Sequence, residues 1–238
     1  MRIQRALTPM KGAPAPPPVP FGGVFTWWAD MNTATYSNSG GTDYIDTVPL
    51  IGVVDQLEPP AASQRPIYNP SGLDGNVTMS TPFIAVNWKL YKATPSAIFA
   101  GGAGTLAFVQ LFSGGITRAL EFGSGYNYQI YSTGIYTPTN GAVFLNMGNS
   151  TNFHVHHFCW NGTTLNYYRD GVLQNSVLLT IGGNNANSFC VNNYRQLNAE
   201  QGYGETGDIV ALTGTALNGT QVADDYNNFW KVKYPSLP

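Results

Sequence analysis

The sequence predicts an all-β protein, a jelly-roll β-sandwich with an extended N-terminal arm and one C-terminal helix. Its 238 residues suit one domain with a large core. From Val24 onward, apolar and polar residues alternate with a period of two, which is typical of half-buried strands. Gly, Asn and Pro interrupt this alternation about every 8 to 12 residues, as turns do in a sandwich.

The strand pattern covers residues 24–28, 84–90, 106–112, 126–131, 142–147, 153–160, 164–169, 172–178, 188–194 and 208–212. Asn161-Gly162 and Asp170-Gly171 separate three of these segments, and both dipeptides tolerate the positive φ of a tight hairpin turn. The three strands around them are therefore predicted to form a meander. Trp160 ends the first of these strands and is expected to lie in the core.

One helix is predicted, over about residues 219–233. Asn218 can cap its N-terminus, with Gln221 three residues later, as in a capping box. Apolar residues then recur at helical spacing until Pro235 ends the pattern: Val222, Tyr226, Phe229 and Trp230. We interpret this stripe as a face that packs on the sandwich rather than as a ligand site.

Residues 1–22 are predicted to form a proline-rich extended arm, and residues 23–238 the sandwich domain with its helix. The first 20 residues contain Arg2, Arg5 and Lys11 and no acidic residue, whereas the rest of the chain has a formal charge of −5. Prolines fix φ and favour a polyproline helix; those of the arm include Pro16, Pro17 and Pro18. We interpret the arm as an anchor that lies on a neighbouring copy or on another protein, with a disordered spacer as the alternative.

Composition argues against several classes of protein. Charged residues make up 10% of the chain, against about 25% in ordinary domains, which suits an extracellular or virion surface. The net charge of −2 argues against nucleic acid as the main partner, and no apolar run is long enough for membrane insertion. The N-terminus lacks the apolar segment of a secretory signal, so synthesis in a host cytoplasm without a signal peptide is expected.

Cysteine and histidine usage does not predict a bound metal. Cys159 and Cys190 both lie in strand-like segments, and we favour buried free thiols over a disulfide. His154, His156 and His157 are the only histidines, and no cysteine or acid stands at ligand spacing beside them. They are interpreted as structural residues, and no cofactor is expected.

Residues 156–173, His-His-Phe-Cys-Trp-Asn-Gly-Thr-Thr-Leu-Asn-Tyr-Tyr-Arg-Asp-Gly-Val-Leu, resemble the central hairpins of the concanavalin A-like lectin/glucanase superfamily, in its laminin G-like branch. Residues 26–30 with 64–68 look like the opening of the versions found in phage structural proteins, and residues 207–212 with 216–218 look like their ending. The resemblance implies the jelly-roll sandwich. The spacing from His156 to Trp160 is two residues shorter than usual, an even shift that keeps each side chain on its own face.

Two further features bear on this resemblance. Arg169 stands where the family has an apolar residue, so its strand is expected to be a sheet edge or to face a partner. Many relatives bind calcium, but the acidic residues of 43–46 and 74–76 are too sparse for a recognisable calcium loop. We therefore expect no bound metal, with calcium as a minor alternative.

Family members that hydrolyse glycans carry two carboxylates on one strand at about i and i+2, because acid and nucleophile must lie close together across the sugar bond. The close acids of this chain are spaced three or one apart, which puts strand partners on opposite faces: Asp43/Asp46, Asp55/Glu58, Glu205/Asp208 and Asp224/Asp225. The chain is therefore not expected to be an enzyme. Asp208 matches an acidic position in the family's last strand and is interpreted as structural.

Glycan contact is predicted on two segments rich in tyrosine and amide side chains, because aromatic faces pack on sugar rings while amides bind hydroxyls. The candidate residues are Tyr126, Tyr128, Asn193, Tyr194, Arg195 and Tyr203. Solvated residues or contacts to protein neighbours are the alternative.

These observations favour a structural virion protein, a phage capsid decoration or fibre-like subunit. Residues 1–22 are expected to bind capsid or tail proteins, the sandwich to contact host-surface glycans, and the chain to form a homo-oligomer. A free-standing carbohydrate-binding module is the alternative function, and a glycan hydrolase comes third.

Overall fold

The computed structural model describes residues 17–59, 65–81, 90–92, 102–112, 118–122, 128–137, 141–145, 147, 152–179, 189–191 and 204–238. Parts of the strand segments predicted at 84–90, 126–131, 142–147 and 188–194 lie outside these residues. Within them the chain is mostly β, with one short C-terminal helix, which confirms the predicted all-β class.

The described strands form two antiparallel sheets. The larger sheet has 11 strands, and its main path runs β1 (Trp27–Ala29), β3 (Thr42–Ile51), β5 (Ile67–Asn69), β6 (Thr78–Thr81), β17 (Gly204–Thr213), β8 (Gly104–Phe112), β13 (His154–Trp160), β14 (Thr164–Arg169) and β15 (Val172–Leu178); β2 (Thr35–Ser39) and β4 (Asp55–Leu57) also pair with β3. The smaller sheet has six strands, in the order β12 (Gly141–Phe144), β11 (Gly134–Thr137), β10 (Tyr128–Tyr131), β9 (Arg118–Phe122), β16 (Phe189–Val191) and β7 (Leu90–Lys92).

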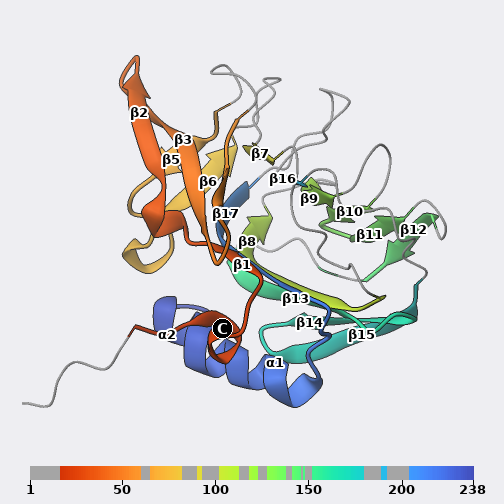
Figure 1. Ribbon diagram of the computed structural model, residues 1–238. Helices are drawn as coiled ribbons and strands as arrows, with labels where there is room; N and C mark the ends of the chain where they lie inside the picture. The colour runs from red at the N-terminus through yellow and green to blue at the C-terminus, as the bar shows by residue number, and fades with distance from the viewer. Residues whose placement is uncertain are drawn as a thin grey trace, which may run out of the picture.

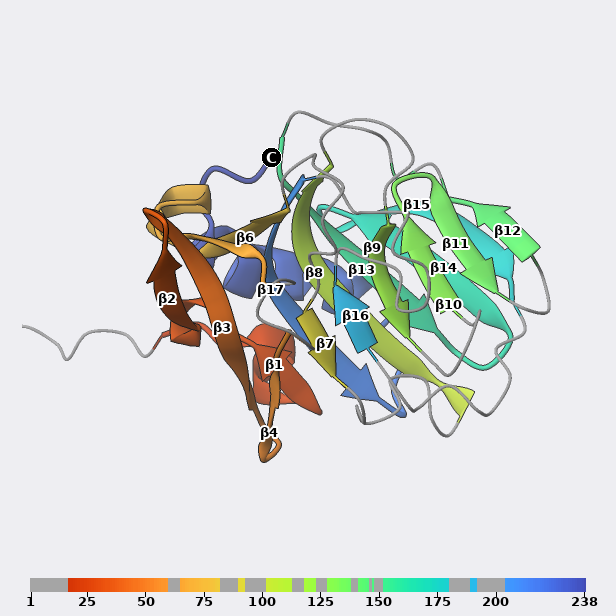
Figure 2. The same cartoon turned by 90° about the horizontal axis from the view of Figure 1, so that it is seen from above.

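The larger sheet is covered on both faces. One apolar cluster, which includes Phe108, Phe158 and Leu120, lies between the two sheets. In the view from above, the small sheet overlies β13 and β14 of the large sheet (Figure 2). A second cluster, which includes Val109 and Trp230, lies between the larger sheet and the C-terminal helix (Figure 1). The molecule therefore has three layers, in the order small sheet, large sheet and helix.

Strand β13 lies in the middle layer, and its sequence reflects this position. Phe158 and Trp160 belong to the cluster between the sheets, whereas Val155 and Cys159 belong to the cluster under the helix. A strand covered on both faces carries a nearly continuous apolar run instead of a clean alternation. Trp160 is buried, as predicted, and its indole Nε1 donates a hydrogen bond to the carbonyl oxygen of Leu179 at 3.1 Å.

One end of the larger sheet closes on itself. β1 pairs with both β3 and β17, and β5 and β6 complete a ring of five strands, β1-β3-β5-β6-β17. Closure leaves β1 with a partner on each side and removes a free sheet edge. The sequence pattern does not predict β2 to β6, because prolines stand inside β3 and on either side of β5.

The predicted meander of β13, β14 and β15 is confirmed. Asp170 and Gly171 have φ values of 53° and 77°, the left-handed conformation that a two-residue hairpin turn requires. The expectation that the strand of Arg169 is a sheet edge is wrong, because β14 lies between β13 and β15. Arg169 instead donates from Nη1 to the carbonyl oxygen of Met147 at 3.1 Å.

The C-terminal helix occupies the predicted residues. α1 (Gly219–Asp225) begins after Asn218, and the capping box with Gln221 is present. A π-helical turn (Tyr226–Trp230) follows, and α2 (Lys231–Lys233) ends the helix before Tyr234. The predicted stripe is buried against the large sheet, as expected. Among the described residues, no helix is long and apolar enough to cross a membrane.

The folded unit begins earlier than the predicted boundary at residue 22. Pro20 and Phe21 are buried in the short 3₁₀ turn η1 (Pro20–Gly23), and Phe21 belongs to the cluster under the helix. Its ring lies 6.4 Å from that of His157, centroid to centroid. The last residues assigned to the arm therefore contribute to the core.

Candidate functional site

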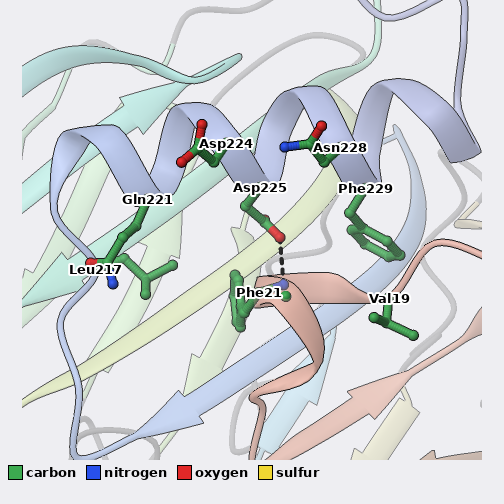
Figure 3. Close-up of a pocket in the computed structure, with 9 residues that line it drawn as sticks. Val19, Phe21, Leu217, Gln221, Asp224, Asp225, Asn228 and Phe229 are labelled. Carbon is green, nitrogen blue, oxygen red and sulfur yellow. Dashed lines mark hydrogen bonds between the residues drawn. The ribbon is translucent and has the colours of Figure 1, made fainter.

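A cleft of about 240 Å³ lies between the N-terminal segment and the C-terminal helix (Figure 3). It is lined by Val19, Phe21, Gly22, Leu217, Gln221, Asp224, Asp225, Asn228 and Phe229. Its two walls come from opposite ends of the chain. The cleft is slightly smaller than the pockets that hold drug-sized ligands, so it suits a single small ring.

The base of the cleft is built around the buried carboxylate of Asp225. Its Oδ1 accepts a 2.5 Å hydrogen bond from the backbone N–H of Phe21, drawn as the dashed line in Figure 3. Its Oδ2 lies 3.0 Å from Nε2 of His157 and accepts a 2.6 Å bond from Nε1 of Trp230. Trp230 is five residues further along the helix, and the π-helical turn brings these two side chains together. These three contacts give both oxygens of the buried Asp225 carboxylate a partner inside the protein.

The rim of the cleft is polar. Gln221, Asp224 and Asn228 are exposed and recur at i, i+3 and i+7, which places them along one side of the helix. Gln221 uses its Oε1 to accept from the N–H of Asn218. Within the part of the chain that the structure describes, the side chains of Asp224 and Asn228 have no hydrogen-bond partner, so both can bind a ligand.

The floor of the cleft is apolar and comes from Phe21, Phe229 and Leu217, of which Phe21 is the most exposed, at 9%. No lysine or arginine is among the described residues that line it. An aromatic floor can pack on the apolar face of a ligand while carboxylate and amide groups bind its hydroxyls. With one exposed carboxylate and no cation, the lining favours a neutral ligand over an anionic one.

The three histidines have structural surroundings. His156 is fully buried, with Nδ1 2.9 Å from the hydroxyl oxygen of Tyr167, and burial lowers its pKa well below the ordinary value. His154 lies 2.5 Å from Asp170, and His157 contacts Asp225. Among the described residues, no group of three His, Cys, Asp or Glu side chains could hold a metal ion.

Asp208 also has a structural environment, in agreement with the interpretation of the sequence. It is fully buried in β17 and accepts from Nε1 of Trp28 at 2.9 Å and from the N–H of Met31 at 3.0 Å. The ammonium of Lys233 contacts both Asp208 and Asp30. Burial raises the pKa of Asp208, and Lys233 opposes that shift. These two carboxylates anchor the end of the helix to the ring of strands.

Cys159 is a buried free thiol, as predicted. Burial raises its pKa to about 12, so the thiolate form is not populated at neutral pH. The side chain of Cys190 lies outside the described residues.

Most of the residues singled out from the sequence lie outside the described part of the chain. This holds for Arg2, Arg5, Lys11, Pro16, Tyr126, Asn193, Tyr194, Arg195 and Tyr203, and for the side chain of Tyr128. Pro17 is exposed and Pro18 half-buried where the N-terminal segment enters the fold beside the cleft. Sequence reasoning missed the cleft, although the polar spacing of residues 221, 224 and 228 was a visible signal.

No protein-family model and no curated protein matches the chain. Among solved structures, the binding domain of botulinum neurotoxin serotype G matches with a TM-score of 0.55 and 12% identity, over 82% of this chain and 50% of that one. Domain 4 of AbnA matches with a TM-score of 0.50 and 14% identity, over 85% of this chain and 98% of that one. AbnA is an extracellular arabinanase from Geobacillus stearothermophilus, and this domain was solved with arabinotriose. Trypanosoma rangeli sialidase matches with a TM-score of 0.51 and 10% identity, over 85% of this chain and 32% of that one.

These likenesses are at the level of the fold. They place the chain with all-β domains of the sandwich type, which agrees with two facing sheets around one core. The chain spans about half of the toxin binding domain and about a third of the sialidase, so the activities of those whole proteins do not follow from the match.

Asp225→Ala is expected to destabilise the protein by about 3 to 5 kcal/mol, because it leaves buried donors of Phe21, His157 and Trp230 without their acceptor. Asp224→Ala is the matched control, since this neighbour is exposed and its loss should change stability by no more than about 0.5 kcal/mol. Urea unfolding of both variants measures the difference. Equal stability of the two variants would contradict the central role of Asp225.

The buried His156 is expected to make the protein less stable in acid. Its folded-state pKa is lowered, so below about pH 6.5 the unfolded chain binds a proton that the folded chain does not. The free energy of unfolding should then fall by up to about 1.4 kcal/mol per pH unit through this group alone. Urea unfolding between pH 7 and 5 should show a steeper loss for the natural protein than for His156→Phe, and parallel pH profiles would refute the assignment.

Proposed function

We propose that this chain is a glycan-recognition domain built on a concanavalin A-like jelly-roll sandwich, and that its cleft holds one neutral sugar ring. The observation that carries this proposal is the combination of an aromatic floor with a rim of unpaired polar side chains, Asp224 and Asn228, in a cleft of about 240 Å³. This is the arrangement that recognises a pyranose, whose ring carbons are apolar and whose edge bears hydroxyls.

The neighbours in fold support the proposal without deciding it. They include a botulinum neurotoxin receptor-binding domain, a domain solved with arabinotriose and a sialidase. Hydrolysis is a weaker candidate for this chain. Asp225 is engaged by three donors, and Asp30 and Asp208 share Lys233, so these three carboxylates have structural partners.

We further propose that the domain is a structural part of a phage particle, a capsid decoration or fibre-like subunit displayed on the virion surface. The low charge content, the proline-rich cationic arm and the resemblance of both ends of the domain to phage structural proteins support this assignment. In it, residues 1–22 bind capsid or tail proteins and copies of the chain assemble on the particle. A free-standing carbohydrate-binding module has no evident use for such an arm.

Binding at the cleft can be measured by NMR titration of the protein with methyl glycosides of glucose, galactose and mannose. We expect a millimolar Kd, about −4 kcal/mol, with shifts in the side-chain amide signals of Gln221 and Asn228. Asp224→Ala with Asn228→Ala should remove the shift of the remaining Gln221 signal, because the rim then lacks its hydroxyl-binding groups. Asn227→Ala, on the same helix but outside the cleft, is the control. Absence of shifts at the cleft, or shifts that persist in the double variant, would contradict the assignment of a sugar site to this cleft.

Anchoring by the arm is tested by truncation. Deleting residues 1–16 should leave the unfolding free energy unchanged, because Pro20 and Phe21, the buried residues of the N-terminal segment, stay in place. The truncated chain should no longer copurify with assembled particles, and the triple variant Arg2→Ala, Arg5→Ala, Lys11→Ala should show whether the cations are responsible. Normal incorporation of the truncated chain would contradict the anchoring role.

A further inference from the structure

A second surface lies on β2 and β5 of the ring of strands, which Figure 1 places on the side away from the helix, and it carries a pair of stacked tyrosines. The rings of Tyr36 in β2 and Tyr68 in β5 lie 4.2 Å apart, centroid to centroid, and 13° from parallel. Tyr36 is 53% exposed, whereas Tyr68 packs against the core cluster between the sheets. The pair is therefore a rigid aromatic ledge, supported by the core on one side and open to solvent on the other.

Strand register places polar groups on the same face as this ledge. Tyr36 is paired with Ile45, and Asn38 with Asp43, so Tyr36, Asn38 and Asp43 point to one side of the β2–β3 hairpin. Tyr68 is paired with Met79, and both Ile45 and Met79 are buried in the cluster between the sheets, so Tyr68 points to that side too. The surface thus combines two tyrosines, one amide and one carboxylate.

The polar groups on this surface can still form hydrogen bonds with a ligand. Asn38 donates from Nδ2 to Oδ1 of Asp43 at 2.8 Å, which orients the carboxylate. Within the described residues, Oδ2 of Asp43 and the hydroxyls of Tyr36 and Tyr68 make no hydrogen bond. Burial raises the pKa of Tyr68, and Tyr36 and Asp43 add to the shift, which agrees with a compact group.

The charges near the ledge indicate what it can bind. Arg65 lies over the ring of Tyr44 and pairs with Asp46 at 2.8 Å, and its further partner Ser37 alternates with Tyr36 and Asn38 on the opposite side of β2. Among the described residues, no lysine or arginine is paired with Asp43, and Arg65 pairs with Asp46 instead. An oriented carboxylate accepts hydrogen bonds from hydroxyl groups and repels an anion, while an aromatic face packs on ring CH groups.

We propose that Tyr36, Tyr68, Asn38 and Asp43 form a second sugar-binding site, selective for neutral pyranosides. The ring of Tyr36 stacks on the apolar face of the sugar, and Asp43 accepts hydrogen bonds from its hydroxyls. The proposal extends the glycan recognition assigned to the cleft but rests on different residues. Two weak sites on one domain, repeated over many copies, raise the overall affinity for a multivalent glycan surface without any stronger single contact.

The test uses the full chain with the cleft silenced by Asp224→Ala and Asn228→Ala, so that only the ledge can bind. Methyl β-glucoside, methyl β-galactoside, methyl α-mannoside and the methyl glycoside of N-acetylneuraminic acid are titrated while aromatic NMR signals are recorded. We expect at least one neutral glycoside to shift the signals of Tyr36 and Tyr68, and the anionic sialoside to bind at least about tenfold more weakly. No shift with any neutral glycoside, or preference for the sialoside, overturns the proposal.

Variants then separate stacking from hydrogen bonding. Tyr36→Ala should weaken binding by about tenfold, whereas Tyr36→Phe should keep it within about threefold, because the ring face is retained. Asp43→Asn should also weaken binding. Undiminished binding by Tyr36→Ala would refute the site even if glycosides bind elsewhere. Because the cleft is inactive in every variant, failure of the ledge and failure of the cleft give separate results.

Discussion

The buried carboxylate of Asp225 is the interaction on which the packing of the helix and the N-terminal segment against the large sheet depends. It joins the backbone of Phe21 near the start of the described fold, the ring of His157 in the central strand β13, and the indole of Trp230 in the helix. A carboxylate without donors would be costly to bury, so these three groups must stay together for any of them to be stable inside the protein. The two walls of the cleft are held in place by the same contacts.

Coverage of both faces of the large sheet explains why so many ionisable groups lie inside this protein. His156 meets Tyr167 on the side of the small sheet, whereas Asp208 meets Lys233 on the side of the helix. The Asp208–Lys233 pair joins β17 to the helix, whereas His156 and Tyr167 join neighbouring strands of the large sheet.

The two candidate binding surfaces both combine aromatic rings with polar side chains, but different elements form them. The cleft lies between the N-terminal segment and the helix, and its aromatic rings form a floor below a polar rim. The ledge is an open surface on the ring of strands, where Tyr36 stacks on Tyr68 beside Asp43. In both, exposed polar side chains lie beside aromatic residues that pack in or against the core. Weak sites of this kind become effective when many copies act together, as on the surface of a particle.

The sequence by itself determined the elements whose signals are local. The dipeptide Asp170-Gly171, which tolerates positive φ, predicts the hairpin, Asn218 and Gln221 predict the start of the helix, and the strand pattern around Trp160 predicts its burial. All three predictions are confirmed. Only the tertiary structure decided which distant residues meet. Phe21 binds Asp225 across 204 positions, and Tyr36 stacks on Tyr68 through the pairing of separate strands. Local signals encode backbone conformation and periodicity. Contacts between distant residues depend on strand pairing and on the packing of layers, which local sequence patterns do not reveal.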